Sequence, residues 1–340
     1  MWHETNFEKS MKARVISDFS QPEAEKICAD YIHAKSYLCS HIYSNIKATE
    51  PNLTDHGEDH IANVLNNASD LLGTDIEKLT GIELYALGIS ILFHDVGNLH
   101  GRDRHNRKIH KIFTTSRAEN LEFTQEFKVV NAIAGAHCGK TADGSSTDTI
   151  SEVAEMLVLQ KKDIRAQRLA AVLRLADELA EGSQRTSDYL LENKMYDNSS
   201  KVFHAYAQGT DVAIMRERGL ISLIYNIHLT KNNNELFVAD DIPLKDYLST
   251  IYNRISKLDS ERRYCRYYCE WLDPFKQVNV DIDFLYNNTP LDNDLGTIHV
   301  TLTDLSNPTS DPSIVTSINP NCEIDSLVGR VHFAVEALND

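Results

Sequence analysis

The sequence predicts a mainly helical protein: an all-helical domain over residues 1–195, followed by a smaller α+β module over residues 196–340. Up to about residue 190, apolar side chains recur at the three- and four-residue spacing of helices. After Arg185, apolar and polar residues alternate in three segments, as they do in half-buried strands. A length of 340 residues fits one large domain or two smaller ones.

The helical domain is interrupted at three polar places. Helical spacing is clearest in five segments: Ile27–Ile46, Ile61–Leu72, Ile82–Phe93, Phe127–Ile133 and Ile164–Leu179. The interruptions are the turn around Pro51, the segment NLHGRDRH and the loop TADGSSTD at 141–148. This loop closely follows a histidine, so it either caps a site or forms a plain surface connection, and we favour the surface connection.

The C-terminal module is expected to contain three strands and one long helix. The strands are GLISLIYNIHL, VNVDIDFLY and TIHVTLTDL. The amphipathic helix, roughly Leu244–Trp271, begins after Pro243 and lies between the first two strands, in the order strand, helix, strand, strand. Residues Leu305–Asn321 are expected to be a loop, and the end, VHFAVEALND, shows no obvious closing element.

Composition and charge limit the function classes. A formal net charge of −16 argues against broad binding to nucleic acid or anionic membranes, although a local basic pocket for a phosphate is compatible with it. No apolar run reaches the length that spans a bilayer, and the start, MWHETNFEKS, lacks the apolar core of a signal peptide. The six cysteines have no disulfide-framework spacing, so we expect free thiols in a reducing compartment and a cytoplasmic location.

The strongest functional signal is the pair His94–Asp95, which ends the apolar helix Leu84–Phe93. Burying such groups without a partner is costly, and a divalent metal satisfies both side chains. The alternative is a helix C-cap, in which a histidine is favourable at the negative end of the helix dipole. Because a cap leaves Asp95 at the unfavourable end, we favour metal binding.

Two further histidine ligands each compete with a neighbour. His60 precedes apolar residues of its helix and is favoured over His56, which is expected at the start of that helix. His105 directly follows the polar turn after the His94–Asp95 pair and is favoured over His110 for a second metal.

Two more candidate ligands lie on apolar helices. His137 stands near the end of one, where the alternative is a hydrogen-bonded core histidine. Asp177 lies within the apolar face of another, where an unpaired carboxylate would be expensive. It needs a cation, which is either the metal or Arg174, and we favour the metal.

Together these donors predict a transition-metal site. Imidazole and carboxylate donors suit Mn, Fe, Co, Ni or Zn. One ion would be held by His60, His94, Asp95 and Asp177. Since Asp95 has two oxygens, it can bridge to a second ion held by His105 and His137, so we expect one or two ions per chain. Two adjacent metals suit attack of water on phosphorus.

These motifs resemble the HD superfamily of metal-dependent phosphohydrolases over about residues 50–190. The matching features are HG..H at His56–His60, HDxG at His94–Gly97, GR..H at Gly101–His105, and RLADEL followed by an arginine at Arg185. The resemblance implies an all-α HD core, with the ligands assigned as above. Unlike two-metal cyclic-di-GMP phosphodiesterases, the chain has His137–Cys138 in place of adjacent histidines and lacks their GYP signature. It also lacks the GHxPFGH-like stretch of deoxynucleotide triphosphohydrolases.

Several basic residues are candidates for binding the substrate phosphate. Guanidinium groups bind phosphate bidentately, whereas lysine acts as a point charge. Arg185 is favoured because it is expected two turns beyond Asp177 on the same helical trajectory. We assign catalytic roles to Asp95, Arg185, Arg102 and Lys140, and substrate binding to Arg174, Arg185 and His110. The run ERRYCRYYCEW at 261–271 can stack on a base, but its aromatic residues are more typical of a core.

The predicted function is therefore hydrolysis of a phosphoester or phosphoanhydride in a nucleotide or cyclic (oligo)nucleotide by metal-activated water. The expected partners are a small nucleotide-type phosphate and, as one option, further copies of the same chain. Membrane binding and strong nucleic-acid binding are not expected. One alternative is a metal-containing nucleotide sensor or scaffold without turnover. Another is an HD-type nuclease on single-stranded nucleic acid, which the net charge disfavours.

Overall fold

The computed structural model describes residues 2–117, 123–239, 241–291, 295–306 and 309–338. Its contacts divide the chain into two units. The first comprises residues 1–180 and 265–273, and the second comprises residues 181–264 and 274–340. The expected boundary at residue 195 lies within the second of these units. Among the described residues, no helix has the length and apolar character needed to cross a membrane.

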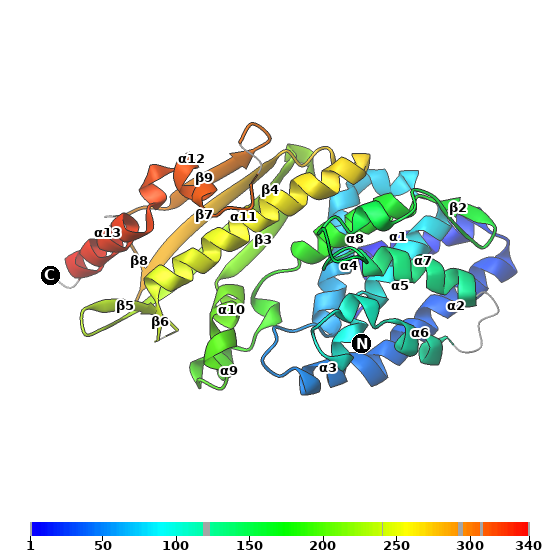
Figure 1. The fold of residues 1–340 in the computed structure, drawn as a ribbon, viewed down its shortest axis with the longest axis horizontal. Helices are drawn as coiled ribbons and strands as arrows, with labels where there is room; N and C mark the ends of the chain where they lie inside the picture. Colours follow the sequence, from blue (N-terminus) through cyan, green and yellow to red (C-terminus); the bar gives the residue numbers. More distant parts are fainter. Residues whose placement is uncertain (1, 118–122, 240, 292–294, 307–308, 339–340) are drawn as a thin grey trace. The chain divides into compact units, whose positions relative to one another are not determined.

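The first unit is a helical bundle around one buried helix, α5 (Figure 1). Every residue of α5 is buried, because the helix packs against five others: α1, α2, α4, α7 and α8. The helices are α1 (Asn6–Asp18), α2 (Gln21–Leu38), α3 (Ser44–Thr49), α4 (Glu58–Leu72), α5 (Gly81–Phe93), α6 (His110–Ser116), α7 (Phe123–Gly135) and α8 (Ala166–Glu178). The predicted mainly helical fold is confirmed.

A partly buried ion pair joins the N-terminal ends of α5 and α8. Glu83 is the third residue of α5, and its carboxylate accepts the backbone N–H and hydroxyl of Thr80 in a capping box. The same carboxylate accepts two hydrogen bonds of 2.6 Å from the guanidinium of Arg165, the residue that precedes α8. This pair therefore fixes the two helices whose other ends carry His94 and Asp177.

A short hairpin interrupts the helices, so the prediction that residues 1–190 are almost entirely helical was wrong here. Strands β1 (Leu157–Leu159) and β2 (Lys162–Ile164) pair antiparallel. Their two-residue turn has positive φ at both Gln160 and Lys161. Such turns usually carry Asn or Gly, so these residues contain no sequence signal for a hairpin.

The second unit contains a mixed sheet with a long helix along it (Figure 1). The two central strands, β4 and β7, pair in parallel, and the remaining pairings are antiparallel. Its strands are β3 (Thr210–Met215), β4 (Leu220–Asn232), β5 (Glu235–Val238), β6 (Ile242–Pro243), β7 (Gln277–Tyr286), β8 (Thr289–Pro290) and β9 (Ile298–Thr303). Its helices are α9 (Asp188–Glu192), α10 (Asn198–Gln208), α11 (Leu244–Tyr268), α12 (Ser313–Ile318) and α13 (Ile324–Ala337).

The predicted order of three strands and a long helix is confirmed in β4, α11, β7 and β9, but other elements were missed. Within residues 305–321, expected to be a loop, α12 is present, while residues 307 and 308 lie outside the described part. The C-terminal segment is also helical: α13 starts seven residues before VHFAVEALND and is capped by Glu323, which accepts two backbone N–H groups. Its buried side chains recur at helical spacing, beginning with Leu327 and continuing with Val331, Ala334 and Val335.

Candidate metal centre

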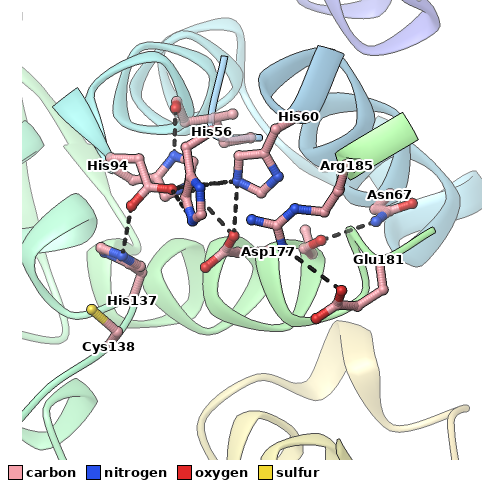
Figure 2. A network of polar contacts seen from close by, with 12 residues as sticks. His56, His60, Asn67, His94, His137, Cys138, Asp177, Glu181 and Arg185 are labelled. Atoms are coloured by element: carbon pink, nitrogen blue, oxygen red, sulfur yellow. Dashed lines mark hydrogen bonds and ion pairs between the residues drawn. The ribbon is translucent and has the colours of Figure 1, made fainter. Parts of the chain in front are cut away.

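Four polar side chains from three helical segments meet in the interior of the first unit (Figure 2). His60 lies in the first turn of α4, His94 and Asp95 directly follow α5, and Asp177 lies in the last turn of α8. The Nε2 atom of His60 is 3.4 Å from His94 Nε2 and 3.2 Å from Asp177 Oδ1. Two ligands about 2.1 Å from a shared ion lie about 3.0–3.4 Å apart, so this donor set fits a transition metal.

His56, the disfavoured rival of His60, also lies beside this donor set (Figure 2). It precedes α4, as expected, and is buried. Its Nε2 atom is 3.8 Å from Asp95 Oδ2 and 3.2 Å from Arg102 Nη1, while its Nδ1 contacts the carbonyl of Thr54. Both histidines of the HG..H motif therefore lie at the site, whereas only His60 was predicted to do so.

A second donor set lies next to the first. His105 and His137 face each other, with their Nε2 atoms 3.2 Å apart. Cys138, which we did not assign a role from the sequence, places its Sγ atom 3.5 Å from His105 Nε2. The three ligand atoms lie within 4.8 Å of one another.

Asp95 lies between the two donor sets and presents one oxygen to each. Its Oδ2 atom is 3.5 Å from His60 Nε2 and 3.3 Å from His94 Nε2. Its Oδ1 atom is 3.1 Å from His105 Nε2 and 3.6 Å from His137 Nε2. This is the arrangement that a carboxylate needs to bridge two ions.

Backbone carbonyls orient three of the four imidazoles. The Nδ1 atom of His94 donates to Ile91 O at 2.8 Å, and that of His137 donates to Ala134 O at 2.6 Å. His105 Nδ1 contacts the carbonyl of Arg102 at 3.1 Å. A proton held on Nδ1 leaves Nε2 as the lone-pair donor, which is the usual supporting arrangement for metal-ligating histidines. His60 differs, because its buried Nδ1 has no hydrogen-bond partner among the described residues.

Gly97 allows the backbone after Asp95 to approach His105. A Cβ atom at Gly97 would lie 1.9 Å from the carbonyl oxygen of His105, and backbone at that position cannot move aside cheaply. The glycine of HDxG is therefore required because the turn after α5 touches the turn that carries His105.

The electrostatics of the site favour cations. Burial opposes charging of the His94 imidazole, but the carboxylates of Asp95 and Asp177 outweigh it and raise its pKa to about 9. Burial likewise opposes ionisation of both carboxyls, yet the surrounding imidazoles hold the pKa of Asp95 and of Asp177 well below the ordinary value. The carboxylates thus stay charged, and a metal ion that binds here would displace the proton of His94.

The Cys138 thiol is also shifted toward its charged form. Burial alone would raise its pKa, but the charge of the adjacent His137 and hydrogen bonding to His105 lower the pKa to about 6. A sulfur atom in this environment can act as a metal ligand, because the thiolate is the ligating form.

Arg102 and Lys140 line a cavity of about 570 Å³ that reaches the second donor set. His105 and Cys138 form part of its wall, together with two further cationic side chains, Arg104 and Arg107. Asp103 and Asp143 also line it, and the predicted loop 141–148 contributes residues Thr141–Gly144. Four basic side chains thus gather at one cavity of an acidic protein.

The other three candidate substrate residues do not line this cavity. Arg174 donates to Thr149 Oγ1 at 2.8 Å and to Ala136 O, so it braces the backbone before His137. His110 is exposed and packs edge-on against Phe127. Arg185 does not continue the helix of Asp177, because α8 ends at Glu178; it lies in a separate 3₁₀ turn of the second unit, 3.8 Å from Glu181.

The fold and the donor sets define a helical domain with a buried His/Asp cluster compatible with divalent metal. The family model described as HD-CE matches residues 50–257, more than half of the chain. The chain therefore belongs to the HD-CE family of the HD superfamily, and the resemblance inferred from its motifs is confirmed. No curated protein and no solved structure matches it.

Proposed function

We propose that this protein is a metal-dependent phosphohydrolase that cleaves a phosphoester or phosphoanhydride in a nucleotide or cyclic (oligo)nucleotide. The observation that carries the proposal is the position of Asp95, whose two oxygens face two separate histidine pairs. Paired sites of this kind suit displacement at phosphorus, because the two ions stabilise the attacking and the leaving oxygen. Membership of the HD superfamily supports the same reaction class.

The chain's own residues hold the ions and attract the substrate. The first ion would be held by His60, His94, Asp95 and Asp177, and the second by Asp95, His105 and His137. Mn, Fe, Co, Ni or Zn fits these donors and, when bound, supplies the Lewis acidity that activates water and polarises a phosphoryl group.

The basic cavity supports a phosphorylated ligand. Arg102 and Lys140 lie at its wall beside His105, within reach of a group bound at the second donor set. Guanidinium groups offer paired donors to phosphate oxygens, and the local positive charge concentrates anions despite the net charge of −16. Catalytic support is therefore assigned to Arg102 and Lys140.

The location and assembly of the chain remain predictions. The six cysteines are present as thiols, which supports a reducing compartment such as the cytoplasm.

Activity measurements on a panel of phosphate compounds test the proposal. The panel contains nucleoside triphosphates, cyclic mononucleotides, cyclic dinucleotides and a chromogenic phosphodiester, each with Mn, Fe, Co, Ni or Zn. We expect turnover of at least one class, reduced by at least roughly 100-fold in Asp95→Asn, because the amide replaces a carboxylate shared by both ions and loss of even a supporting contact costs about 10- to 100-fold.

The matched control is Asp163→Asn, which changes an exposed aspartate on β2 and should leave turnover unchanged. Full activity in Asp95→Asn would contradict the proposal. A metal-loaded wild type that binds nucleotides but hydrolyses none would favour the sensor or scaffold.

A further inference from the structure

The two donor sets differ in chemical character. His60, His94, Asp95 and Asp177 offer only imidazole nitrogen and carboxylate oxygen. The second set adds a thiol, because Cys138 lies with His105 and His137 in one group of potential ligands. Nitrogen and oxygen donors accept many divalent ions, whereas thiolate favours soft or borderline ions such as zinc.

The backbone around Cys138 is held in place by a buried asparagine. Asn106 Nδ2 donates to the carbonyl of Gly135 at 2.8 Å and to that of Cys138 at 3.0 Å. Asn106 directly follows His105, so one short turn positions both a histidine ligand and the loop that presents the sulfur. The chain then turns away at Gly139, which has a φ of +86° and lies against the Asn106 side chain.

The sulfur of Cys138 lies among the donor atoms of the second set. Its distance of 3.5 Å to His105 Nε2 is close to the separation of about 3.5 Å expected for sulfur and nitrogen on one tetrahedral zinc ion. Asp95 Oδ1 lies 3.1 Å from the same nitrogen. Two imidazoles, one thiol and one carboxylate oxygen make four donors, the number that zinc usually takes.

We propose that Cys138 is a protein ligand of the second metal ion, and that this position selects a thiophilic ion such as zinc. The first position, without sulfur, then accepts a harder ion such as Mn or Fe, so the centre can hold two different metals. This inference rests on the two-ion centre of the proposed function. It concerns the ligand set of that centre rather than its substrate.

Cobalt(II) titration of the metal-free full-length protein tests the sulfur ligand directly. Cobalt bound by thiolate shows a sulfur-to-metal charge-transfer band, which cobalt bound by nitrogen and oxygen lacks. We expect two equivalents in the wild type, with the band developing as the second position fills. Zinc X-ray absorption of the same position should show one sulfur neighbour at about 2.3 Å.

Three variants test whether the charge-transfer band comes from Cys138. Cys138→Ser should lose the band and bind the second equivalent more weakly, by at least the roughly 10- to 100-fold that loss of a supporting hydrogen bond costs. Cys138→His should retain two equivalents without the band. Cys28→Ser, which removes another partly exposed free thiol, should behave as wild type.

A band that persists in Cys138→Ser would overturn the inference, as would two cobalt ions in the wild type without a band, or no cobalt bound at all. The first two results leave phosphohydrolase activity possible and so contradict only the ligand assignment. A charge-transfer band confined to proteins with Cys138, in an enzyme that hydrolyses no phosphate, would instead contradict the proposed function alone.

Discussion

Asp95 is the residue on which both donor sets depend. It is almost fully buried, and each of its oxygens lies within 3.6 Å of two imidazole nitrogens. A buried carboxylate is expensive to leave uncompensated, and the surrounding imidazoles, or metal ions bound between them, would compensate its charge. In the proposed two-ion centre, Asp95 would therefore be a ligand shared by both ions rather than a ligand of one.

A substitution at Gly97 tests how His105 is positioned. In Gly97→Ala the new methyl group would lie 1.9 Å from the carbonyl oxygen of His105, so the turn that carries His105 must shift. We expect the second ion to be lost or bound about 10- to 100-fold more weakly, while the first position keeps its ion. Metal content after dialysis measures both.

Gly135→Ala is the matched control, because its Cβ atom would lie 3.6 Å from the nearest neighbour, an ordinary contact. Two tightly held ions in Gly97→Ala would show that the approach of the two turns does not position His105.

The helices α5 and α8 act as a pair that carries most of the first donor set. Their N-terminal ends are joined by Glu83 and Arg165, and their C-terminal ends supply His94, Asp95 and Asp177. The hydrophobic burial of α5 from end to end keeps the pair rigid. A change at Glu83 therefore tests how the bundle holds the site without touching a ligand.

In Glu83→Gln we expect a loss of about 2–3 kcal/mol in the free energy of unfolding, because Arg165 loses its charged partner while remaining partly exposed. Burial opposes ionisation of Glu83, but hydrogen bonds from Arg165 and Thr80 lower its pKa below 4.5. Its contribution is thus fully present above pH 4.5 and is lost as the pH falls through the lowered pKa.

Denaturant unfolding of the metal-free protein checks this prediction. The difference between wild type and Glu83→Gln should be largest at neutral pH and should shrink in acid. Glu77→Gln, at an exposed glutamate close by, should show little effect at either pH. A difference that is independent of pH would mean that the charge of Glu83 does not stabilise the fold.

At the scale of the whole molecule, the sequence predicted the helical domain, the sheet module and the six His and Asp side chains that meet in the two potential donor sets. These donors were recognisable because polar residues such as Asp177 stand within apolar helical faces, where chance rarely places them. Arg185 was placed wrongly because helical spacing does not show where a helix ends, and α8 ends at Glu178.

Two residues at the site could not be predicted, because they reach it through contacts that the local sequence does not encode. His56 lies before α4 and reaches the donor set only through the packing of its loop. Cys138 was noted as a departure from the usual adjacent histidines, yet its distance to His105, a residue 33 positions earlier, becomes visible only in the folded chain. The β1–β2 hairpin was missed because its turn lacks the usual residues.

The most direct test of the two-ion centre is the metal content of purified wild type and Asp95→Ala, measured by elemental analysis after reconstitution and dialysis. We expect close to two divalent ions per chain in the wild type, and a loss of both in the variant, because Asp95 serves both positions. Two ions retained in Asp95→Ala, or no ion bound by the wild type, would contradict the bridged metal centre.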